Sequence, residues 1–588
     1  MQQSCKQCSV VFEISPEDLK FYDKASPVIA GKKYPLPPPT LCPHCREQRR
    51  LAFRNQQTLY KRTCDHCHKP IVSIYSPDKP HKVYCPTDWW SDKWDAIQYG
   101  RDYDFTRPFF VQFRELMVQV PHMSVLMSNC QNSDYTNQSY NNRDCYLSSA
   151  IKDCEGAIYC QNSNELTDCM DSSYCFKSQL LSEATDTYDS YNCTRVRNCI
   201  QCTDSAFLYD CIGCNHCFGC VGLRNKSYQF FNEQLTKEEY ERRRMQYPLQ
   251  QRSISQTIQK QFNEFILKYP HLAAWMRNCE NTTGNNVRNS RNSTHCFDCN
   301  DIEDCRYSTW VFQSKDAVDC YGMGGSQITY ENVGTEEVKN VLFSFGTSMS
   351  YECIHTDLCF SCHHCFGCVG LRNKSYCIFN KQYTEEAYAE LVPKIIAHMQ
   401  STREWGEFFP ASLAAFAYKE SKAQEDFPLA VKEARAQGFH SPVTAFAYNE
   451  TKAFEDFPLT KDVALAWGFS WKDNVDEPVT VEKIIPGDRL PDNLDDIPDD
   501  ILNWAIRCSE TGRPYRVTKK ELAFYRQQSL PVPTVHPDVR SRNRLAARNP
   551  RELWKRNCKK CGKPVETTYG PNRAEIIYCE ECYLKEMY

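Results

Sequence analysis

The stretch NCQNSDYTNQSYNNRDCYLSSAIKDCEGAIYCQNSNELTDCMDSSYC, residues 129–175, places cysteine at a fixed interval. Four cysteines in it stand 15 residues apart: Cys130, Cys145, Cys160 and Cys175. A fixed short period is the signature of a solenoid. We therefore expect a three-sided β-solenoid with 15-residue coils, in which small Cys and Ser side chains fill a narrow interior.

The solenoid block is repeated further along the chain. HCFGCVGLRNKSY at residues 216–228 recurs without change at residues 364–376, which predicts two solenoid modules in tandem. A capping-box pattern at Thr236 and Glu239 predicts a helix after the first module, and Thr384 begins the equivalent helix after the second. Such helices would cover the strand edges at the ends of the modules.

Composition limits the cellular setting. The chain has 588 residues, 36 cysteines and a formal charge of −4. Its first residues are polar rather than signal-like, and no apolar run approaches the length of a membrane span, so we expect a cytoplasmic protein with no membrane partner. In a reducing compartment, regularly spaced cysteines are expected to be metal ligands or buried thiols rather than disulfides.

The N-terminal segment carries two knuckles, Cys5-x2-Cys8 and Cys42-x2-Cys45. Two such pairs can place four thiolates tetrahedrally around Zn²⁺. With these pairs, residues 1–50 resemble the bacterial domain family called probable zinc ribbon, which is treble-clef-like. The whole arrangement resembles large Cys-rich zinc-ribbon proteins of candidate-phylum bacteria, a resemblance that implies no activity.

A second site follows the first. Cys64-x2-Cys67 opens it, Cys85 lies where the second knuckle should begin, and the fourth ligand position holds Asp88. A carboxylate can bind zinc, so this third candidate zinc site is either a variant site or a lost one. Three histidines lie nearby as alternative ligands: His66, His68 and His81.

The C-terminal segment repeats the N-terminal one. Residues 51–67 align with residues 545–561 at an offset of 494, and the alignment continues through both knuckles. The C-terminal copy is a complete four-cysteine site formed by Cys558, Cys561, Cys579 and Cys582.

The copy that precedes this site has lost most of its ligands. Only Cys508 and His536 keep ligand chemistry at the positions of the first site, which is too few for a structural zinc site. We predict that this domain folds by packing and binds no zinc.

Each solenoid block ends in a CxxCxxCxxC cluster. The two clusters are Cys211, Cys214, Cys217 and Cys220, and Cys359, Cys362, Cys365 and Cys368. Ferredoxin ligation uses C-x2-C-x2-C-x3-C-P, and the last gap here is shorter and lacks the proline, so an iron–sulfur cluster is not favoured. Two interpretations stay open: a second class of metal site, or buried and corner thiols.

Two basic segments lie between the knuckle pairs. Their predicted nucleic-acid-binding residues are Arg46, Arg49, Arg50, Arg54, Lys61, Arg62, Arg540, Arg542, Arg544, Arg548, Lys555 and Arg556. Clusters of this kind attract phosphate backbones by counterion release. The alternatives are solvated helix faces, or pairing with the acidic stretch 492–500, which would cancel this function.

The predicted fold is a multidomain, β-rich α+β protein. Its segments are a zinc ribbon (1–62), a second zinc-ribbon-like site (63–95), a helical connector (96–128), the first β-solenoid module with its helical cap (129–276), the second (277–409), two 30-residue repeats (410–472), an acidic linker (473–500), a degenerate zinc-ribbon-like domain (501–544) and a C-terminal zinc ribbon (545–588).

The sequence carries no P-loop, dinucleotide fingerprint or zincin motif. The leading hypothesis is a non-enzymatic zinc protein whose ribbons bind RNA, DNA or a ribonucleoprotein, with the solenoids as a protein-binding spacer. The alternatives are a redox or metal-handling protein that uses the CxxCxxCxxC clusters, and a purely structural scaffold for protein interactions.

Overall fold

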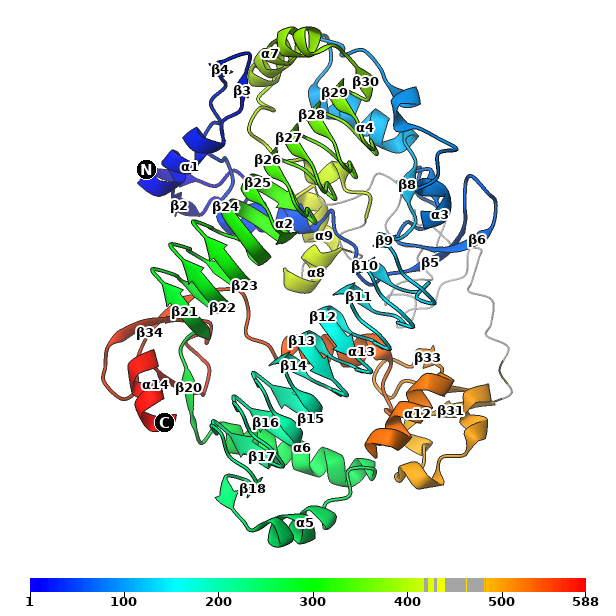
Figure 1. The fold of residues 1–588 in the computed structure, drawn as a ribbon, viewed down its shortest axis with the longest axis vertical. Helices are drawn as coiled ribbons and strands as arrows, with labels where there is room; N and C mark the ends of the chain where they lie inside the picture. Colours follow the sequence, from blue (N-terminus) through cyan, green and yellow to red (C-terminus); the bar gives the residue numbers. More distant parts are fainter. Residues whose placement is uncertain (417–420, 428–430, 439–461, 463–480, 482, 588) are drawn as a thin grey trace.

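The centre of the chain forms a parallel β-solenoid arranged as two stacks that lie side by side (Figure 1). The computed structural model describes all residues except 417–420, 428–430, 439–461, 463–480, 482 and 588. The first stack is an 11-stranded sheet, and the second is a 10-stranded sheet. That each stack is an independent module stays a prediction.

The strands of the first stack are β9 (Met127–Ser128), β10 (Asn137–Tyr140), β11 (Ser149–Lys152), β12 (Gln161–Thr167), β13 (Ser173–Gln179), β14 (Thr185–Tyr188), β15 (Tyr191–Arg197), β16 (Thr203–Tyr209), β17 (Phe218–Val221), β18 (Gln229–Phe230) and β19 (Glu233–Gln234). Those of the second stack are β21 (Met276–Glu280), β22 (Gly284–Arg291), β23 (Cys296–Glu303), β24 (Thr309–Gly324), β25 (Gln327–Val333), β26 (Lys339–Leu342), β27 (Tyr351–Ile354), β28 (His363–Phe366), β29 (Ser375–Ile378) and β30 (Lys381–Gln382).

The register of these strands corrects the predicted coil. Ser149 pairs with Gln161, and Ser173 pairs with Thr185, so successive coils are 12 residues apart. The predicted 15-residue, three-sided coil is therefore wrong. An interval of 15 residues is one coil plus one further step of three, which makes the cysteine columns run diagonally around the solenoid.

The step of three has a backbone cause. From Gln138 to Phe231, every third residue has a positive φ, and the residue after it points inward, as at Asp144 before the buried Cys145. Asn, Asp and Gly adopt this conformation more readily than other residues, which explains their frequency in the blocks. Each 12-residue coil therefore has four three-residue sides.

Helices follow the last coil of each stack at the predicted places, and their role as caps stays a prediction. After the first stack come α5 (Lys237–Met245) and α6 (Arg252–Ile266), and after the second comes α7 (Glu385–Ser401). The Thr236 hydroxyl accepts a hydrogen bond from the Glu239 amide, and Thr384 caps α7 in the same way. The connector before the first stack contains α4 (Phe109–Gln119).

The terminal segments consist of short strands and helices. The N-terminal elements are β1 (Gln2–Ser4), β2 (Val11–Glu13), α1 (Pro16–Ala25), β3 (Val28–Ile29), β4 (Lys32–Lys33), α2 (Pro43–Leu51), β5 (Tyr60–Thr63), β6 (Pro70–Ser73), β7 (Val83–Tyr84), α3 (Pro86–Trp89), η1 (Ala96–Tyr99) and β8 (His122–Met123). The C-terminal elements are β31 (Lys483–Pro486), η5 (Gly487–Arg489), η6 (Leu494–Asp496), η7 (Asp499–Asn503), β32 (Trp504–Arg507), β33 (Pro514–Tyr515), α12 (Lys519–Gln528), α13 (Pro537–Ala546), β34 (Trp554–Asn557), β35 (Pro564–Thr567), β36 (Ile576–Tyr578) and α14 (Glu580–Met587).

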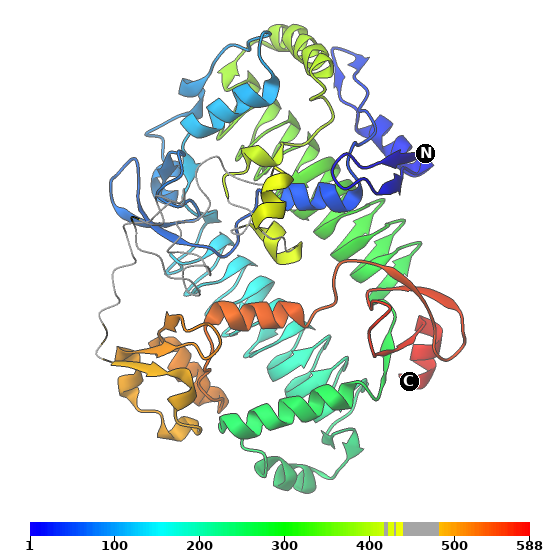
Figure 2. The same ribbon diagram turned by 180° about the vertical axis from the view of Figure 1, so that it is seen from behind.

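The terminal segments cross over the stacks (Figure 2). In the N-terminal segment, α2 packs on β24 and β25 of the second stack, whereas β7 pairs with β8, which leads into the first stack. In the C-terminal segment, α13 lies along the first stack, whereas β36 pairs with β20 (Pro270–Leu272), which leads into the second. Each terminal segment therefore contacts both stacks.

Only part of the first predicted 30-residue repeat is described, as η2 (Ala411–Leu413), α8 (Lys422–Asp426) and α9 (Val431–Ala436). Its second copy, residues 445–459, and residues 473–480 of the predicted acidic linker lie outside the described residues. Among the described helices, none combines the length and the apolar character that crossing a membrane requires.

Candidate metal centres and the arginine helices

Three groups of side chains converge as candidate metal centres. In each group, one ligand atom per residue lies within 4.8 Å of all the others. Site 1 is Cys5, Cys8, Cys42 and Cys45; site 2 is Cys64, Cys67, Cys85 and Asp88; site 3 is Cys558, Cys561, Cys579 and Cys582. The structure thus brings together all the ligands predicted for these sites.

The sulfur spacing fits a tetrahedral metal ion. Metal–sulfur bonds of about 2.3 Å place the sulfurs of a tetrahedral site about 3.8 Å apart. The Sγ atoms of Cys8 and Cys42 are 3.7 Å apart, and those of Cys561 and Cys579 are also 3.7 Å apart. Sites 1 and 3 could therefore hold a metal ion with little rearrangement.

Site 1 is built on the first turn of α2. Cys42 is the N-cap residue and Pro43 follows it, so Cys45 lies one turn into the helix, on the same side as Cys42. Hydrogen bonds from Cys45 and Cys8 help to lower the pKa of Cys42 to about 5, whereas the hydrogen bond with Cys42 and burial raise the pKa of Cys45. One thiolate is stabilised by its neighbours, and a bound cation would favour ionisation of the others.

Asp88 is the fourth member of site 2. Its Oδ2 atom lies 3.1 Å from the Sγ atom of Cys85 and 3.4 Å from that of Cys64, and a hydrogen bond from Cys67 is the main reason that the pKa of Asp88 falls to about 2. Of the alternative ligands, His66 lies outside this group, with Nδ1 3.5 Å from Asp88. His81 is buried against the ring of His122.

The degenerate domain keeps the same local plan without four ligands. His536 is the N-cap residue of α13, at the position equivalent to Cys42, and its backbone amide donates to Cys508 Sγ at 3.2 Å. The His536 ring accepts from the amide of Asp538 instead of facing a thiolate. That this domain binds no zinc stays a prediction.

The CxxCxxCxxC clusters have a backbone explanation. Four cysteines at intervals of three occupy four consecutive inward positions, one on each side of a coil, and all eight are buried. Their thiols donate to backbone carbonyls; that of Cys211, for example, donates to the carbonyls of Tyr209 and Cys220. Within the described part of the chain, none of the eight belongs to a group with metal-ligand spacing. The structure therefore favours buried thiols.

The arginines of α2 are buried against the second stack. Arg46 and Arg50, which are 2% and 1% exposed, both pair with Asp319, at 2.8 and 3.3 Å. Arg49 binds Glu331 at 2.7 Å, and Glu331 also lies 3.6 Å from Arg50. A row of guanidinium groups on one helix is thus neutralised by carboxylates at the corners of the solenoid.

The arginines of α13 are buried against the first stack. Arg540 and Arg544 both pair with Asp171, at 3.0 and 2.6 Å. Just beyond the helix, Arg548 stacks on the ring of Tyr174 at 3.6 Å and binds Asp186 at 2.8 Å. We call α2 and α13 the arginine helices.

The two sets of contacts are equivalent by sequence. Arg46 and Arg50 align with Arg540 and Arg544 at the offset of 494, and Asp171 aligns with Asp319 at the offset of 148 between the solenoid blocks. The same contact therefore occurs twice, with the N-terminal helix on the second stack and the C-terminal helix on the first. We call this arrangement, in which each arginine helix docks on the stack that is farther from it in the sequence, the crossed pairing.

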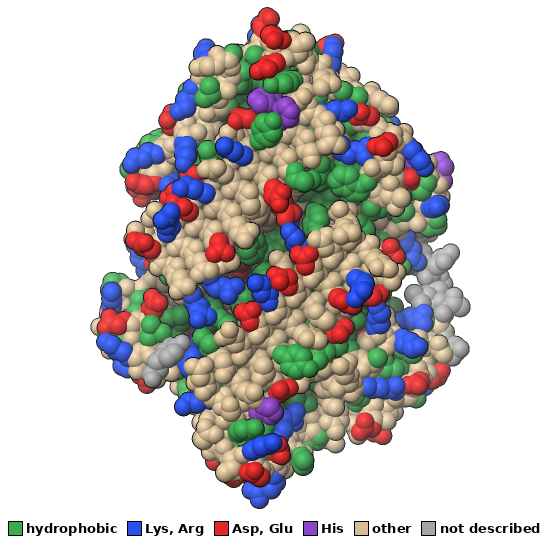
Figure 3. Space-filling model, in the orientation of Figure 1, with side chains coloured by type: hydrophobic (Ala, Val, Ile, Leu, Met, Phe, Trp, Pro, Cys, Tyr) green, Lys and Arg blue, Asp and Glu red, His purple; other side chains and the backbone are tan. Residues whose placement is uncertain are grey.

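Arg548 also joins the two stacks to each other. It hydrogen-bonds to Asp186 of the first stack and to Asp298 of the second. Lys152 and Glu336 pair across the same boundary at 2.9 Å. Figure 3 shows charged side chains along this boundary, between the largely uncharged surfaces of the two stacks.

These contacts correct most of the predicted nucleic-acid interface. Arg46, Arg49, Arg50, Arg54, Arg540 and Arg544 are buried, and Arg548 is engaged by two carboxylates, so these side chains cannot reach a phosphate backbone. The cause is pairing within the chain, with solenoid carboxylates rather than with the predicted stretch 492–500. Arg62 donates to Asp65 and to backbone carbonyls. Of the remaining predicted residues, Lys61, Arg542 and Lys555 are exposed and Arg556 is half-buried.

The carboxylate partners were not predicted. Asp171, Asp186, Asp298, Asp319 and Glu331 all occupy positive-φ corners of the coils, where an acidic residue is explained equally well by backbone conformation. The usable signal was the spacing of Arg46, Arg50 and Arg54, which repeats at 540, 544 and 548. Within each helix, the first two arginines lie one turn apart on one face, and the third follows just beyond the helix.

No family model and no curated protein matches this chain. The resemblance to the zinc-ribbon family therefore stays a prediction that rests on cysteine spacing. The functional argument depends on the geometry of the sites.

Proposed function

We propose that this protein is a non-enzymatic scaffold in which zinc ions in sites 1, 2 and 3 hold ribbon-like terminal segments as clamps across the two solenoid stacks. The observation that carries the proposal is the insertion of the arginine helices. Arg46 and Arg50 reach Asp319 from a helix whose first turn supplies two ligands of site 1.

Zinc suits these donors because closed structural sites of four ligands with thiolate sulfur are typical of this ion. Binding energy at such a site contributes directly to the folding of the ligand segments. Here the ligand segments also carry or flank the elements that dock on the stacks, namely α2 and β7 on one side and β36 on the other. Metal binding would therefore stabilise the joined arrangement of the stacks.

Metal analysis of protein purified without oxygen tests this function. We expect one zinc ion for each of sites 1, 2 and 3, and the loss of one zinc in Cys45→Ser and in Cys561→Ser. Cys508→Ser is the matched control, because Cys508 lies in the degenerate domain and should leave the zinc content unchanged. Zinc-free protein that keeps the same fold would overturn the proposal, as would iron in place of zinc.

A second measurement tests the clamp. After chelation we expect trypsin to cleave within residues 43–54, because the arginines there are released from the second stack, while the stacks themselves resist cleavage. Equal protection of this segment with and without metal would show that α2 docks on the second stack without zinc, and would refute the proposed link between metal binding and docking.

A further inference from the structure

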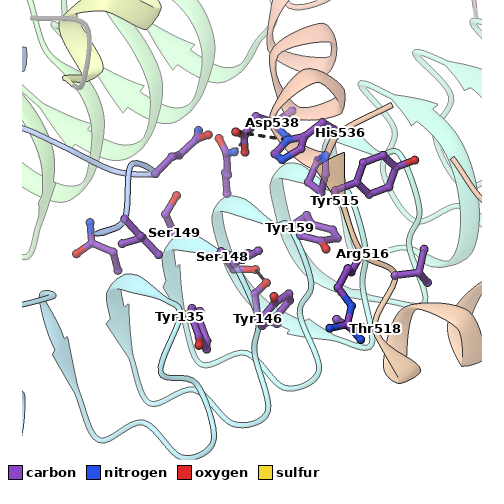
Figure 4. Close-up of a pocket in the computed structure, with 18 of the residues that line it drawn as sticks. Tyr135, Tyr146, Ser148, Ser149, Tyr159, Tyr515, Arg516, Thr518, His536 and Asp538 are labelled. Atoms are coloured by element: carbon purple, nitrogen blue, oxygen red, sulfur yellow. Dashed lines mark hydrogen bonds and ion pairs between the residues drawn. The ribbon is translucent and has the colours of Figure 1, made fainter. Parts of the chain in front are cut away.

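A cavity lies between the first stack and the degenerate domain. It has a volume of about 520 Å³, within the range of small-molecule sites, and it opens to solvent. One wall comes from consecutive coils of the first stack and another from β33 and the start of α12 and α13, and Gln56, Gln57 and Leu59 of the N-terminal segment also line the cavity (Figure 4). The cavity lies apart from sites 1, 2 and 3.

Aromatic rings form the solenoid wall. Tyr135, Tyr146 and Tyr159 come from successive coils, with ring centroids 5.6 and 6.0 Å apart. Figure 4 shows all three beside the cavity, with Tyr515 on the opposite wall. Tyr135 is 46% exposed and Tyr146 is half-buried, whereas Tyr159 is buried under the Arg540 guanidinium. Tyr135 and Tyr146 therefore supply the open aromatic surface, which is suited to contact with a flat ring.

The polar groups of the cavity favour an anion. Arg516 and Lys519 line it, are exposed and form no ion pair with a carboxylate in the described part of the chain. Among the described residues, Asp538 is the one acidic residue that lines it, and Asp538 pairs with Arg513 at 2.9 Å. Ser149, which is 4% exposed, lines the cavity, and its buried hydroxyl lacks a hydrogen-bond partner among the residues that the structure describes. Positive charge and an unused hydroxyl thus lie beside the aromatic wall.

The second stack keeps only part of the equivalent wall. At the offset of 148, Tyr159 corresponds to Tyr307, whereas Tyr146 corresponds to Thr294 and Ser149 corresponds to Phe297. The cavity therefore belongs to the half of the molecule whose ribbon has lost its metal ligands.

We propose that this cavity binds a nucleoside phosphate, with the base against the tyrosine row and the phosphate near Arg516 and Lys519. The ligand is either a free mononucleotide or the terminal nucleotide of a strand, since both present the same base and phosphate. Arg516 and Lys519 are not among the buried arginines of the arginine helices, although α13 lines the cavity and its Arg540 lies over the ring of Tyr159.

Isothermal titration of the full-length, metal-loaded protein tests the site. The probes are the four common nucleoside 5′-monophosphates, the matching neutral nucleosides, ribose 5-phosphate, and a 5′-phosphorylated tetranucleotide. We expect at least one nucleotide to bind more tightly than its nucleoside and than ribose 5-phosphate. Tighter binding of the tetranucleotide than of the mononucleotide would identify a strand end as the ligand, and the reverse order a free nucleotide. No saturable binding of any nucleotide at millimolar concentration would overturn the proposal.

Variants test which residues act. Tyr146→Thr introduces the residue that the second stack carries at this position, so the fold should tolerate it, and loss of stacking should weaken binding about five-fold or more. Ser149→Phe, which likewise copies the second stack, should fill the cavity and abolish binding. Arg516→Gln should weaken the nucleotide but not the nucleoside, whereas Arg242→Gln on α5, 76% exposed at its side chain, is the charge-matched control. Equal affinity of Tyr146→Thr, Ser149→Phe and the unaltered protein would refute the assignment.

Discussion

Asp319→Asn is the sharpest test of the arginine helices. The substitution keeps the size of the side chain but removes the charge shared by Arg46 and Arg50, and all three side chains are at most 2% exposed. Removing one partner of a buried ion pair typically costs about 3–5 kcal/mol, because the remaining charge stays buried. Glu331, 3.6 Å from Arg50, offsets part of this loss, so we expect the low end of the range.

Hydrogen exchange of the α2 amides measures this local effect. A loss of about 3 kcal/mol in the free energy of opening corresponds to about a 100-fold loss of protection in residues 43–51. The matched control is Asp23→Asn, since Asp23 pairs with Lys33 at 2.8 Å but their side chains are 73% and 42% exposed. A surface pair of this kind is worth about 1 kcal/mol at most.

The reasoning would be refuted by a small effect. If Asp319→Asn lowered protection of α2 no more than Asp23→Asn does, the carboxylate would not hold the helix on the second stack. The equivalent substitution in the first stack, Asp171→Asn, should reproduce the loss in α13, because Asp171 accepts Arg540 and Arg544. An effect on one helix alone would contradict the equivalence of the two copies.

Three further outcomes are expected. Burial among aromatic rings lowers the pKa of His355 to about 3. Below a pH of about 6.5 the unfolded chain therefore binds a proton at this residue and the folded chain does not, so the free energy of unfolding falls as the pH drops through this window. Between pH 7 and 5, the free energy of urea unfolding should fall by about 2 kcal/mol less in His355→Phe than in the unaltered protein. Cys214→Ser and Cys362→Ser should leave the metal content measured by mass spectrometry unchanged. Loss of a metal ion in either variant would instead support metal binding by the CxxCxxCxxC clusters. Asp88→Cys should give site 2 the ligand set of site 3 and slow zinc loss to a chelator, whereas an unaltered protein that carries no zinc at site 2 would show that site 2 is not a zinc site.

Local features of the fold were predictable from sequence. Ligand spacing identified sites 1 and 3, and alignment with Cys582 placed Asp88 as the fourth member of site 2. The caps at Thr236 and Thr384 were predictable because a hydroxyl and an amide three residues later meet in the first helical turn. Each of these inferences depends on residues close in sequence or on a fixed spacing.

The coil length was not predictable in the same way. Cysteine recurs along a diagonal because inward positions come every three residues, while the coil closes after 12. Cys, Ser, Ala and Leu all fit the inward positions, so the recurrence of cysteine alone does not give the number of residues in a coil. The three-residue interval is set by the positive-φ residue that precedes each inward residue, as Asp144 precedes Cys145.

The burial of the arginines could not be predicted from local sequence, because their partners are far away in the chain. Arg46 meets Asp319 across 273 residues, and Arg544 meets Asp171 across 373. The crossed pairing means that the N-terminal helix docks on the second stack, whereas Asp171 of the first stack meets its arginines only when the C-terminal helix is present. Contacts of such long range form late, since the closure of long loops precedes any gain from them. On the proposed function, metal binding at the terminal sites would order the docking elements locally before these contacts form, and site 1 would then act in assembly as well as in stability.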